Sequence, residues 1–319
     1  MNRQLTGLCA LLLLTAGCSP RATDSDAVRR GDESFALGEY DEAIAEYRLA
    51  IRQGVDDPTI VARVAHTYAL LGRVDDAGNY YVDASARDPE LTDQAVSDLM
   101  WLARTSFDAG DRFSMARAVE TALELRPGIG IDQMALPLAR HYYAAGEYGR
   151  ALPFYQKAMA EATGESAPEI VFEVGVAYDE IGDCANGLIF FERFREMVRP
   201  WEQGEVDWYI GTCAFALARD LRDRIEDFDP LDVRSELEES LRLVERTIAV
   251  QEPRNIQAQA WFEKGEILVD LRRCDDAMTA YAQVRYADQA GSLIDRAQDR
   301  FDEIRFGREL EHLRDGRCR

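Results

Sequence analysis

GEYDEAIAEYRLAI at residues 38–51 and GEYGRALPFYQKAM at residues 146–159 are two copies of one pattern. In each copy a glycine is followed by alanine after five residues, tyrosine after nine and alanine after twelve. Steps of four and three residues place these three side chains on one face of a helix. Small side chains let a second helix approach closely, and the ring fills the space between the two backbones. The pattern therefore predicts a helix that begins after the glycine and packs against a neighbouring helix.

The same pattern recurs along the chain with a period of 34–38 residues. The glycines are Gly38, Gly72, Gly110, Gly146 and Gly182, and Ala218 and Arg272 occupy the same place in two later units. Seven residues earlier stands a small residue in every unit: Gly31, Ala65, Ala103, Ala139, Gly175, Gly211 and Gly265. We therefore expect seven hairpins of two helices, with the turn glycines in the left-handed conformation. One hairpin cannot bury its apolar face alone, so neighbouring hairpins must stack.

This recurrence resembles the tetratricopeptide repeat, a helix-turn-helix unit with this period and with small and aromatic residues at these positions. The resemblance covers residues 27–290 in about seven units. It implies an all-α fold, a right-handed superhelical solenoid in which the first helices of the units line an inner groove. The charged segment at residues 291–319 is expected to form a helix that caps the last unit, because terminal repeats need a polar outer face.

The sixth unit departs from the period through an insertion at residues 219–234. Two interpretations remain open. In the first, the first helix of the unit is lengthened and breaks at Asp229-Pro230, since proline stops a helix. In the second, the insertion is a loop without a role.

Residues 1–17 have the features of a secretory signal: one arginine, an apolar stretch and a small-residue cleavage site before Cys18. The apolar stretch is shorter than the roughly 20 residues that cross a bilayer. Small residues directly before a cysteine resemble the lipobox of bacterial lipoproteins. The resemblance implies that Cys18 is acylated, with chains such as palmitate, that residues 18–26 are a lipidated linker, and that Ser19 favours the outer membrane. An ordinary secretory signal with a chance cysteine is the alternative.

The composition excludes several classes of function. The chain has 59 acidic and 37 basic residues and a formal net charge of −22, which argues against a nucleic-acid binder and against electrostatic adhesion to anionic lipid. Its 319 residues contain no glycine-rich phosphate loop, no G-x-S-x-G and no H-E-x-x-H motif. We therefore expect neither an enzyme nor a protein with a cofactor or a bound metal.

Four cysteines lie beyond Cys18: Cys184, Cys213, Cys274 and Cys318. In an exported chain the compartment is oxidising, and an even number of cysteines favours pairing. Stacking of the fifth unit on the sixth would bring Cys184 close to Cys213. Cys274 and Cys318 would then tie the capping helix to the last unit. Buried free thiols are the alternative. No C-x-x-C spacing occurs, so the sequence gives no sign of a zinc or redox site.

The first helices carry side chains that an inner groove would expose. Six residues before the turn, three consecutive units place His66, Arg104 and Arg140. Aromatic candidates on the same helices are Phe107, Tyr143, Phe172 and Trp208. Because guanidinium groups bind carboxylates and rings give rigid apolar contact, this set is a candidate site for an extended peptide or a partner helix with an acidic group. In the alternative interpretation the rings belong to the core and the arginines pair with neighbouring Asp or Glu.

These observations predict a non-enzymatic scaffold or adaptor, lipid-anchored at the outer membrane of a bacterial cell envelope and facing the periplasm. Its expected partners are envelope proteins or their peptides, and its expected contact with the membrane is the lipid anchor alone. The alternative function is that of a periplasmic chaperone or pilotin-type carrier of outer-membrane or pilus subunits. A likeness of fold does not choose between them.

Overall fold

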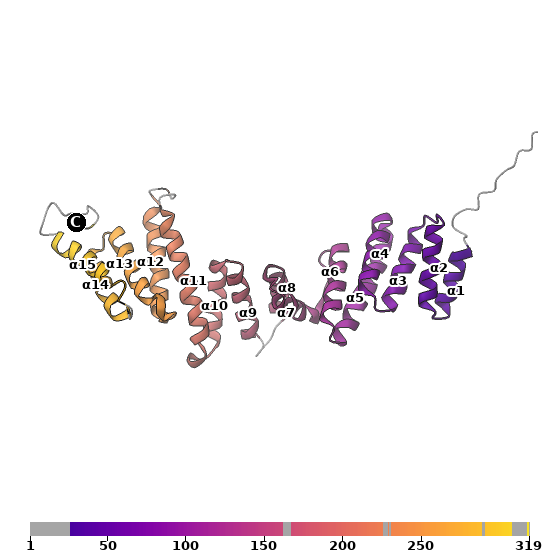
Figure 1. The fold of residues 1–319 in the computed structure, drawn as a ribbon, viewed down its shortest axis with the longest axis horizontal. Helices are drawn as coiled ribbons and strands as arrows, with labels where there is room; N and C mark the ends of the chain where they lie inside the picture. Colours follow the sequence, from indigo (N-terminus) through magenta and orange to yellow (C-terminus); the bar gives the residue numbers. More distant parts are fainter. Residues whose placement is uncertain are drawn as a thin grey trace, which may run out of the picture. The chain divides into compact units, whose positions relative to one another are not determined.

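The computed structural model describes residues 26–161, 167–225, 229, 231–288, 291–307 and 318. The predicted signal peptide and the acylation site Cys18 lie outside these residues. The described residues form α-helices and short 3-10 turns and contain no strand (Figure 1). This confirms the predicted all-α helical-repeat fold. No helix in this part of the chain combines the length and the apolar character needed to cross a bilayer.

Contacts divide the chain into two units, residues 1–131 and residues 132–319. The N-terminal unit contains three hairpins. They are α1 (Asp26–Ala36) with α2 (Tyr40–Arg52), α3 (Pro58–Leu70) with α4 (Val74–Arg87), and α5 (Thr92–Asp108) with α6 (Arg112–Leu125). The helices of each hairpin pack together, and each hairpin packs against the next, as stacking of incomplete apolar faces requires (Figure 1).

The C-terminal unit contains four hairpins and one further helix. The hairpins are α7 (Ala135–Ala144) with α8 (Tyr148–Glu161), α9 (Ala167–Glu180) with α10 (Cys184–Met197), α11 (Gly204–Asp223) with α12 (Val233–Val250), and α13 (Gln257–Asp270) with α14 (Cys274–Ala287). Helices that follow one another in the chain are in contact throughout this unit. Of the predicted capping segment at 291–319, α15 (Ile294–Gly307) is described, and it packs on α14 with Ala297 and Ile304 buried.

Six of the hairpins turn on a residue with positive φ. The five predicted turn glycines, Gly38, Gly72, Gly110, Gly146 and Gly182, have φ between 71° and 79°. Arg272 takes the same conformation, with φ of 61°, in the seventh hairpin. An L side chain adopts this conformation at a steric cost, so the turn at Arg272 is strained where the glycine turns are not.

The small residue before the turn and the ring after it interlock, which explains why both recur. A Cβ built on Gly31 would lie 2.6 Å from the ring of Tyr47, and one built on Gly175 would lie 2.7 Å from the ring of Phe191. Both rings are buried. Each hairpin of this kind closes only because its first helix has no side chain at that position.

The sixth hairpin differs, and the turn expected at Ala218 is wrong. Ala218 is fully buried inside α11, which continues to Asp223. The first helix is therefore lengthened, but it ends six residues before the expected break at Asp229, which is not helical. Pro230 lies outside the described residues.

Arg222 gives the lengthened helix a packing role. Its guanidinium lies 2.5 Å from Glu263 and 3.5 Å from Glu266 and from Asp270, all on α13. Glu266 also accepts a hydrogen bond from Arg300 of α15 at 2.8 Å. The network joins α11, α13 and α15, so the helical part of the insertion, which contains Arg222, has a packing role.

Candidate functional site

The predicted groove residue His66 is held inside the N-terminal unit. Its Nδ1 lies 2.7 Å from Oδ2 of Asp98 on α5, and the Tyr81 hydroxyl donates to the same oxygen. The hydrogen bond to Asp98 raises the pKa of His66. Burial alone would raise the pKa of Asp98, but the hydrogen bonds from His66 and Tyr81 hold that pKa below its usual value. The pair links α3 to α5 rather than presenting an isolated cation.

Arg140 is also engaged with its neighbours, in the C-terminal unit. Its Nε donates to both carboxylate oxygens of Glu173 at 3.0 Å, and one terminal nitrogen lies 3.4 Å from Glu169. Arg104 lies exposed on α5 in the other unit. The contact of Arg140 with Glu173 is of the kind that the alternative interpretation describes, in which the arginines pair with neighbouring Asp or Glu.

The four predicted groove rings divide into two kinds. Phe107, Tyr143 and Phe172 are half-buried, and Phe172 packs against Phe191, Phe194 and Tyr209 of the core. Trp208 on α11 is 45% exposed. Of these rings, Trp208 is therefore the one that offers a large surface to a partner.

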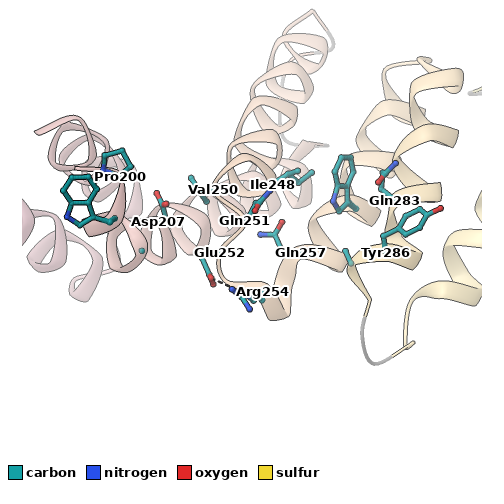
Figure 2. A pocket seen from close by; sticks show the side chains of 14 residues that line it. Pro200, Asp207, Ile248, Val250, Gln251, Glu252, Arg254, Gln257, Gln283 and Tyr286 are labelled. Carbon is teal, nitrogen blue, oxygen red and sulfur yellow. Dashed lines mark ion pairs between the residues drawn. The ribbon is translucent and has the colours of Figure 1, made fainter. Parts of the chain in front are cut away.

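A pocket of about 680 Å³ opens in the C-terminal unit, and we name it the aromatic pocket (Figure 2). Pro200 and Asp207 lie on one side of it, and Gln283 and Tyr286 lie on the other, with the connection between α12 and α13 in the middle. Trp201 and Trp261 also line it. The pocket therefore spans the sixth and seventh hairpins and the segment that leads into the sixth.

Two rings beside the aromatic pocket project into solvent. Trp201 is 74% exposed and Tyr286 is 77% exposed. Trp261 is half-buried, with the ammonium of Lys264 5.4 Å from its ring centre. Trp201 lies in the short turn Pro200–Glu202, and Tyr286 lies near the end of α14. Neither lies on the first helix of a hairpin, which is where the sequence pattern predicts groove residues.

The charged groups of the aromatic pocket are paired with one another or with a neighbour. Asp207 accepts from Nε of Arg195 at 2.5 Å, and Glu252 lies 3.4 Å from Arg254. The remaining polar lining includes the amides of Gln251, Gln257 and Gln283. An amide both donates and accepts hydrogen bonds, so the pocket offers rings and neutral polar groups rather than a single sign of charge.

Hydrogen bonds from side chains to the backbone hold residues 251–257, which form the floor of the aromatic pocket. Gln251 ends α12 with φ of 60°. The Thr247 hydroxyl donates to the carbonyl of Gly211 at 3.1 Å, and Nε2 of Gln257 donates to the carbonyl of Thr247 at 3.1 Å. These bonds tie α11, α12 and the start of α13 together beneath the pocket.

A second hollow, of about 530 Å³, is lined in part by the same connection. Trp208 and Phe215 of α11 line it, together with Pro253 and Ile256. Glu252 lines the aromatic pocket and Pro253 lines this hollow, so the segment 251–256 contributes to both. The predicted residue Trp208 thus lines a hollow, together with residues other than the predicted ones.

The structure contains two disulfides, and they join the cysteines that the sequence analysis pairs. Cys184 at the start of α10 is bonded to Cys213 of α11, with Cα atoms 5.1 Å apart. Cys274 at the start of α14 is bonded to Cys318, with Cα atoms 5.7 Å apart. The first bond links the fifth hairpin to the sixth.

One carboxylate stands beside the first disulfide. Oδ1 of Asp179 lies 3.2 Å from Sγ of Cys213 and 3.6 Å from Sγ of Cys184. Burial, with a smaller effect of the Glu180 charge, raises the pKa of Asp179. Among the described residues, these three are the one group of potential metal ligands whose ligand atoms all lie within 4.8 Å of one another.

Sequence comparison identifies the repeats. Two profiles of the tetratricopeptide repeat match the chain, one at residues 28–91 and the other at residues 137–169. The first match spans α1 to α4, and the second begins in α7 and includes α8. The chain therefore contains tetratricopeptide repeats. A search among curated proteins found no match.

Solved structures of other repeat proteins are similar to this chain in fold. The C-terminal part of a TPR repeat-containing protein from Cytophaga hutchinsonii is 16% identical, with 86% of this chain and 98% of that one covered and a TM-score of 0.32. The TPR2AB domain of yeast Sti1, solved in complex with pHSP90, is 15% identical, with 90% and 95% covered and a TM-score of 0.26. The TPR domain of P58(IPK) is 14% identical, with 87% and 98% covered and a TM-score of 0.28. At this level the similarity concerns the fold alone.

Proposed function

We propose that this protein is a non-enzymatic interaction scaffold that binds segments of partner proteins in the aromatic pocket. The observation that carries the proposal is the exposure of Trp201 and Tyr286 beside a preformed hollow. Tryptophan and tyrosine are the residues that most often supply binding free energy at protein interfaces, because they bury a large area at a small cost in side-chain entropy.

The polar lining indicates the kind of segment that fits. Glutamine amides can pair with the N–H and C=O groups of an extended peptide backbone, while rings accept its apolar side chains. Since Asp207 and Glu252 are already paired, neither requires a charged group of the ligand. The proposed ligand is therefore an extended, largely uncharged peptide segment, rather than the acidic group that the arginines on the first helices suggest.

Crosslinking from defined positions tests this function. A photoreactive phenylalanine analogue at position 201 or 286 of the full chain is expected to capture partner proteins in whole membranes. The matched control is position 113, because Phe113 on α6 is 60% exposed but lies in the N-terminal unit. Trp201→Ala and Tyr286→Ala are expected to reduce co-purification of the captured partner at least about tenfold, the equivalent of about 1.4 kcal/mol. Equal capture from all three positions would contradict the proposal.

We further propose that the chain is anchored through acylated Cys18 at the outer membrane and faces the periplasm. The support is the signal-like segment at residues 1–17 and the small residues before Cys18. Labelling with an alkyne-bearing palmitate analogue is expected to tag the wild-type chain but not Cys18→Ser, which should leave the membrane fraction. A Cys18→Ser chain that remains tagged and membrane-bound would refute the anchor.

Carriage of unfolded outer-membrane or pilus subunits is the second candidate function. Two hollows with exposed rings that both include residues of the segment 251–256 favour it, because a carrier needs several apolar contact points. Suppression of client aggregation without a stable complex would indicate a carrier, whereas a stable complex that survives washing indicates a scaffold.

A further inference from the structure

A half-buried carboxylate without a cation faces the Cys184–Cys213 disulfide. Asp179 closes the last turn of α9, Cys184 opens α10, and Cys213 lies in the middle of α11. A carboxylate held away from water normally pairs with a cation or accepts hydrogen bonds. A disulfide has no S–H group to donate. No described lysine, arginine or histidine pairs with Asp179, and the adjacent residue, Glu180, is also acidic. The oxidised pair therefore does not explain this carboxylate.

The distances fit the edges of a tetrahedral metal site. Zinc bonds sulfur at about 2.3 Å and carboxylate oxygen at about 2.0 Å, which separates tetrahedral S and O ligands by about 3.5 Å. Oδ1 of Asp179 lies 3.2 Å from one sulfur and 3.6 Å from the other. Only the two sulfurs need to move apart, and breaking their bond allows this.

We propose that reduction converts Asp179, Cys184 and Cys213 into a site for a thiophilic divalent cation of the zinc class. The reductant is a dithiol. Its thiolate attacks Cys184, the bond between the two cysteine sulfurs breaks, and Cys213 leaves as the thiolate. The second thiol of the reductant then displaces Cys184, so the reductant becomes a disulfide and the two cysteines gain two electrons and two protons. Binding of the cation releases those two protons, and water completes the coordination.

Accessibility sets the order of these steps. Cys184 is half-buried in the first turn of α10, whereas Cys213 is fully buried. The incoming thiolate therefore reaches Cys184 first. Among the described residues, no comparable group of ligands surrounds Cys274 and Cys318, so the second disulfide is an internal control.

A redox titration tests the proposal in the full chain carrying C9S and C18S. The protein is equilibrated in buffers of reduced and oxidised dithiothreitol at a fixed free Zn²⁺ concentration, and each cysteine pair is followed by alkylation and peptide mass spectrometry. The midpoint is the ratio of reduced to oxidised dithiothreitol at which half of the Cys184–Cys213 pair is reduced. Zn²⁺ is expected to lower this ratio at least about tenfold, because binding to the reduced cysteines stabilises the reduced protein. The midpoint of Cys274–Cys318 is expected to stay unchanged. Equal shifts of both pairs, or no shift of the first, would overturn the proposal.

Variants separate the metal site from a general effect of reduction. Asp179→Asn is expected to remove most of the Zn²⁺-dependent shift, while the matched control Glu180→Gln, an exposed neighbour, keeps it. After reduction, Cd²⁺ is expected to bind once per chain with a thiolate charge-transfer band, which Cys184→Ser and Cys213→Ser remove. An Asp179→Asn chain with the full shift overturns the proposal, and so does a reduced chain that loses its helical circular dichroism and binds no ion.

Discussion

The backbone of Gly211 on α11 lies against the carbonyl group of Glu252, so that a Cβ on Gly211 would overlap the carbonyl oxygen. In the first and fifth hairpins the equivalent glycines face the rings of Tyr47 and Phe191. In the sixth hairpin the connection after α12 takes that space. The floor of the aromatic pocket is thus held by backbone against backbone, which leaves no flexible side chain to move aside.

Gly211→Ala is therefore expected to destabilise the protein by at least about 2 kcal/mol, because the added methyl group has to displace the main chain at Glu252. The urea midpoint of unfolding measures the loss. Gly204→Ala is the matched control, since a Cβ there meets no atom within 4 Å, and its effect should stay within about 0.5 kcal/mol. Similar midpoints for the two variants would show that the close approach is not rigid.

The turn at Arg272 is expected to improve when its side chain is removed. Arg272→Gly relieves a positive φ of 61° and should raise stability by about 0.5 kcal/mol, after the greater freedom of glycine in the unfolded chain is subtracted. The reverse change, Gly72→Ala, places a Cβ in open space at a φ of 71° and should cost about 1 kcal/mol. Thermal unfolding of both variants measures whether the first gains stability and the second loses it. A destabilised Arg272→Gly variant would mean that contacts of the arginine side chain outweigh the backbone strain.

His66 and Asp98 are expected to give the N-terminal unit a pH-dependent contribution to stability. The pKa of His66 is raised in the folded state, so its contribution is complete below the unfolded value of about 6.5 and is lost as pH rises through the folded pKa. The pKa of Asp98 is lowered in the folded state. Its contribution to stability is therefore complete above the unfolded pKa of about 3.9 and is lost as pH falls through the folded pKa.

Both side chains are partly exposed, so the effect should stay below about 1 kcal/mol. Urea unfolding at pH 5.5 and pH 8.5 measures it, and the imidazole resonances of His66 report the folded pKa directly. His66→Gln should lose more stability at the lower pH. A loss that is independent of pH would count against the ion pair.

Arg222→Met is expected to cost more stability at neutral pH than in acid. Burial alone would lower the pKa of Arg222, but Glu263, Asp270 and Glu266 raise it. Removal of the guanidinium takes away a positive charge beside three carboxylates, of which Glu266 keeps its bond to Arg300, at a cost of about 2 kcal/mol at pH 7.

In that variant, repulsion raises the folded pKa values of the carboxylates, so protonation between pH 7 and pH 4.5 stabilises the folded state relative to neutral pH. The wild type gains no such stabilisation between these pH values, because hydrogen bonds from Tyr281 and Arg300 outweigh burial and hold the pKa of Glu266 below its usual value, so that its contribution is lost only at lower pH. The difference in free energy of unfolding between the two chains should therefore shrink on acidification. A constant difference would indicate that Arg222 acts through packing alone.

The sequence predicts the hairpins well because a local rule builds them. Gly31 and Tyr47 lie sixteen residues apart in one hairpin, and their complementary sizes recur in phase. The rule fails at Ala218, where a small residue satisfies the pattern inside a helix that continues, because small residues also suit a buried helix position. The stability of that longer helix depends on Arg222 meeting α13, which no local pattern shows.

The candidate sites were less predictable than the repeats. Trp201 and Tyr286 stand outside the repeating positions, so periodicity gives them no weight, and their shared pocket depends on how three successive segments pack. The role of Asp179 also depends on packing, since one aspartate among many acidic residues carries no signal until α9, α10 and α11 meet. The cysteine pairs could be predicted because adjacent stacking limits the choices.

The bond between Cys274 and Cys318 changes how the array would carry tension. A force applied at residue 318 enters the chain at the first residue of α14, because the sulfur bridge bypasses the intervening backbone. The two cysteines are 44 positions apart, and α15, which lies between them, is then outside the loaded path. Pulling at residue 318 would load the packing of α14 against α13, while α15 would bear no tension.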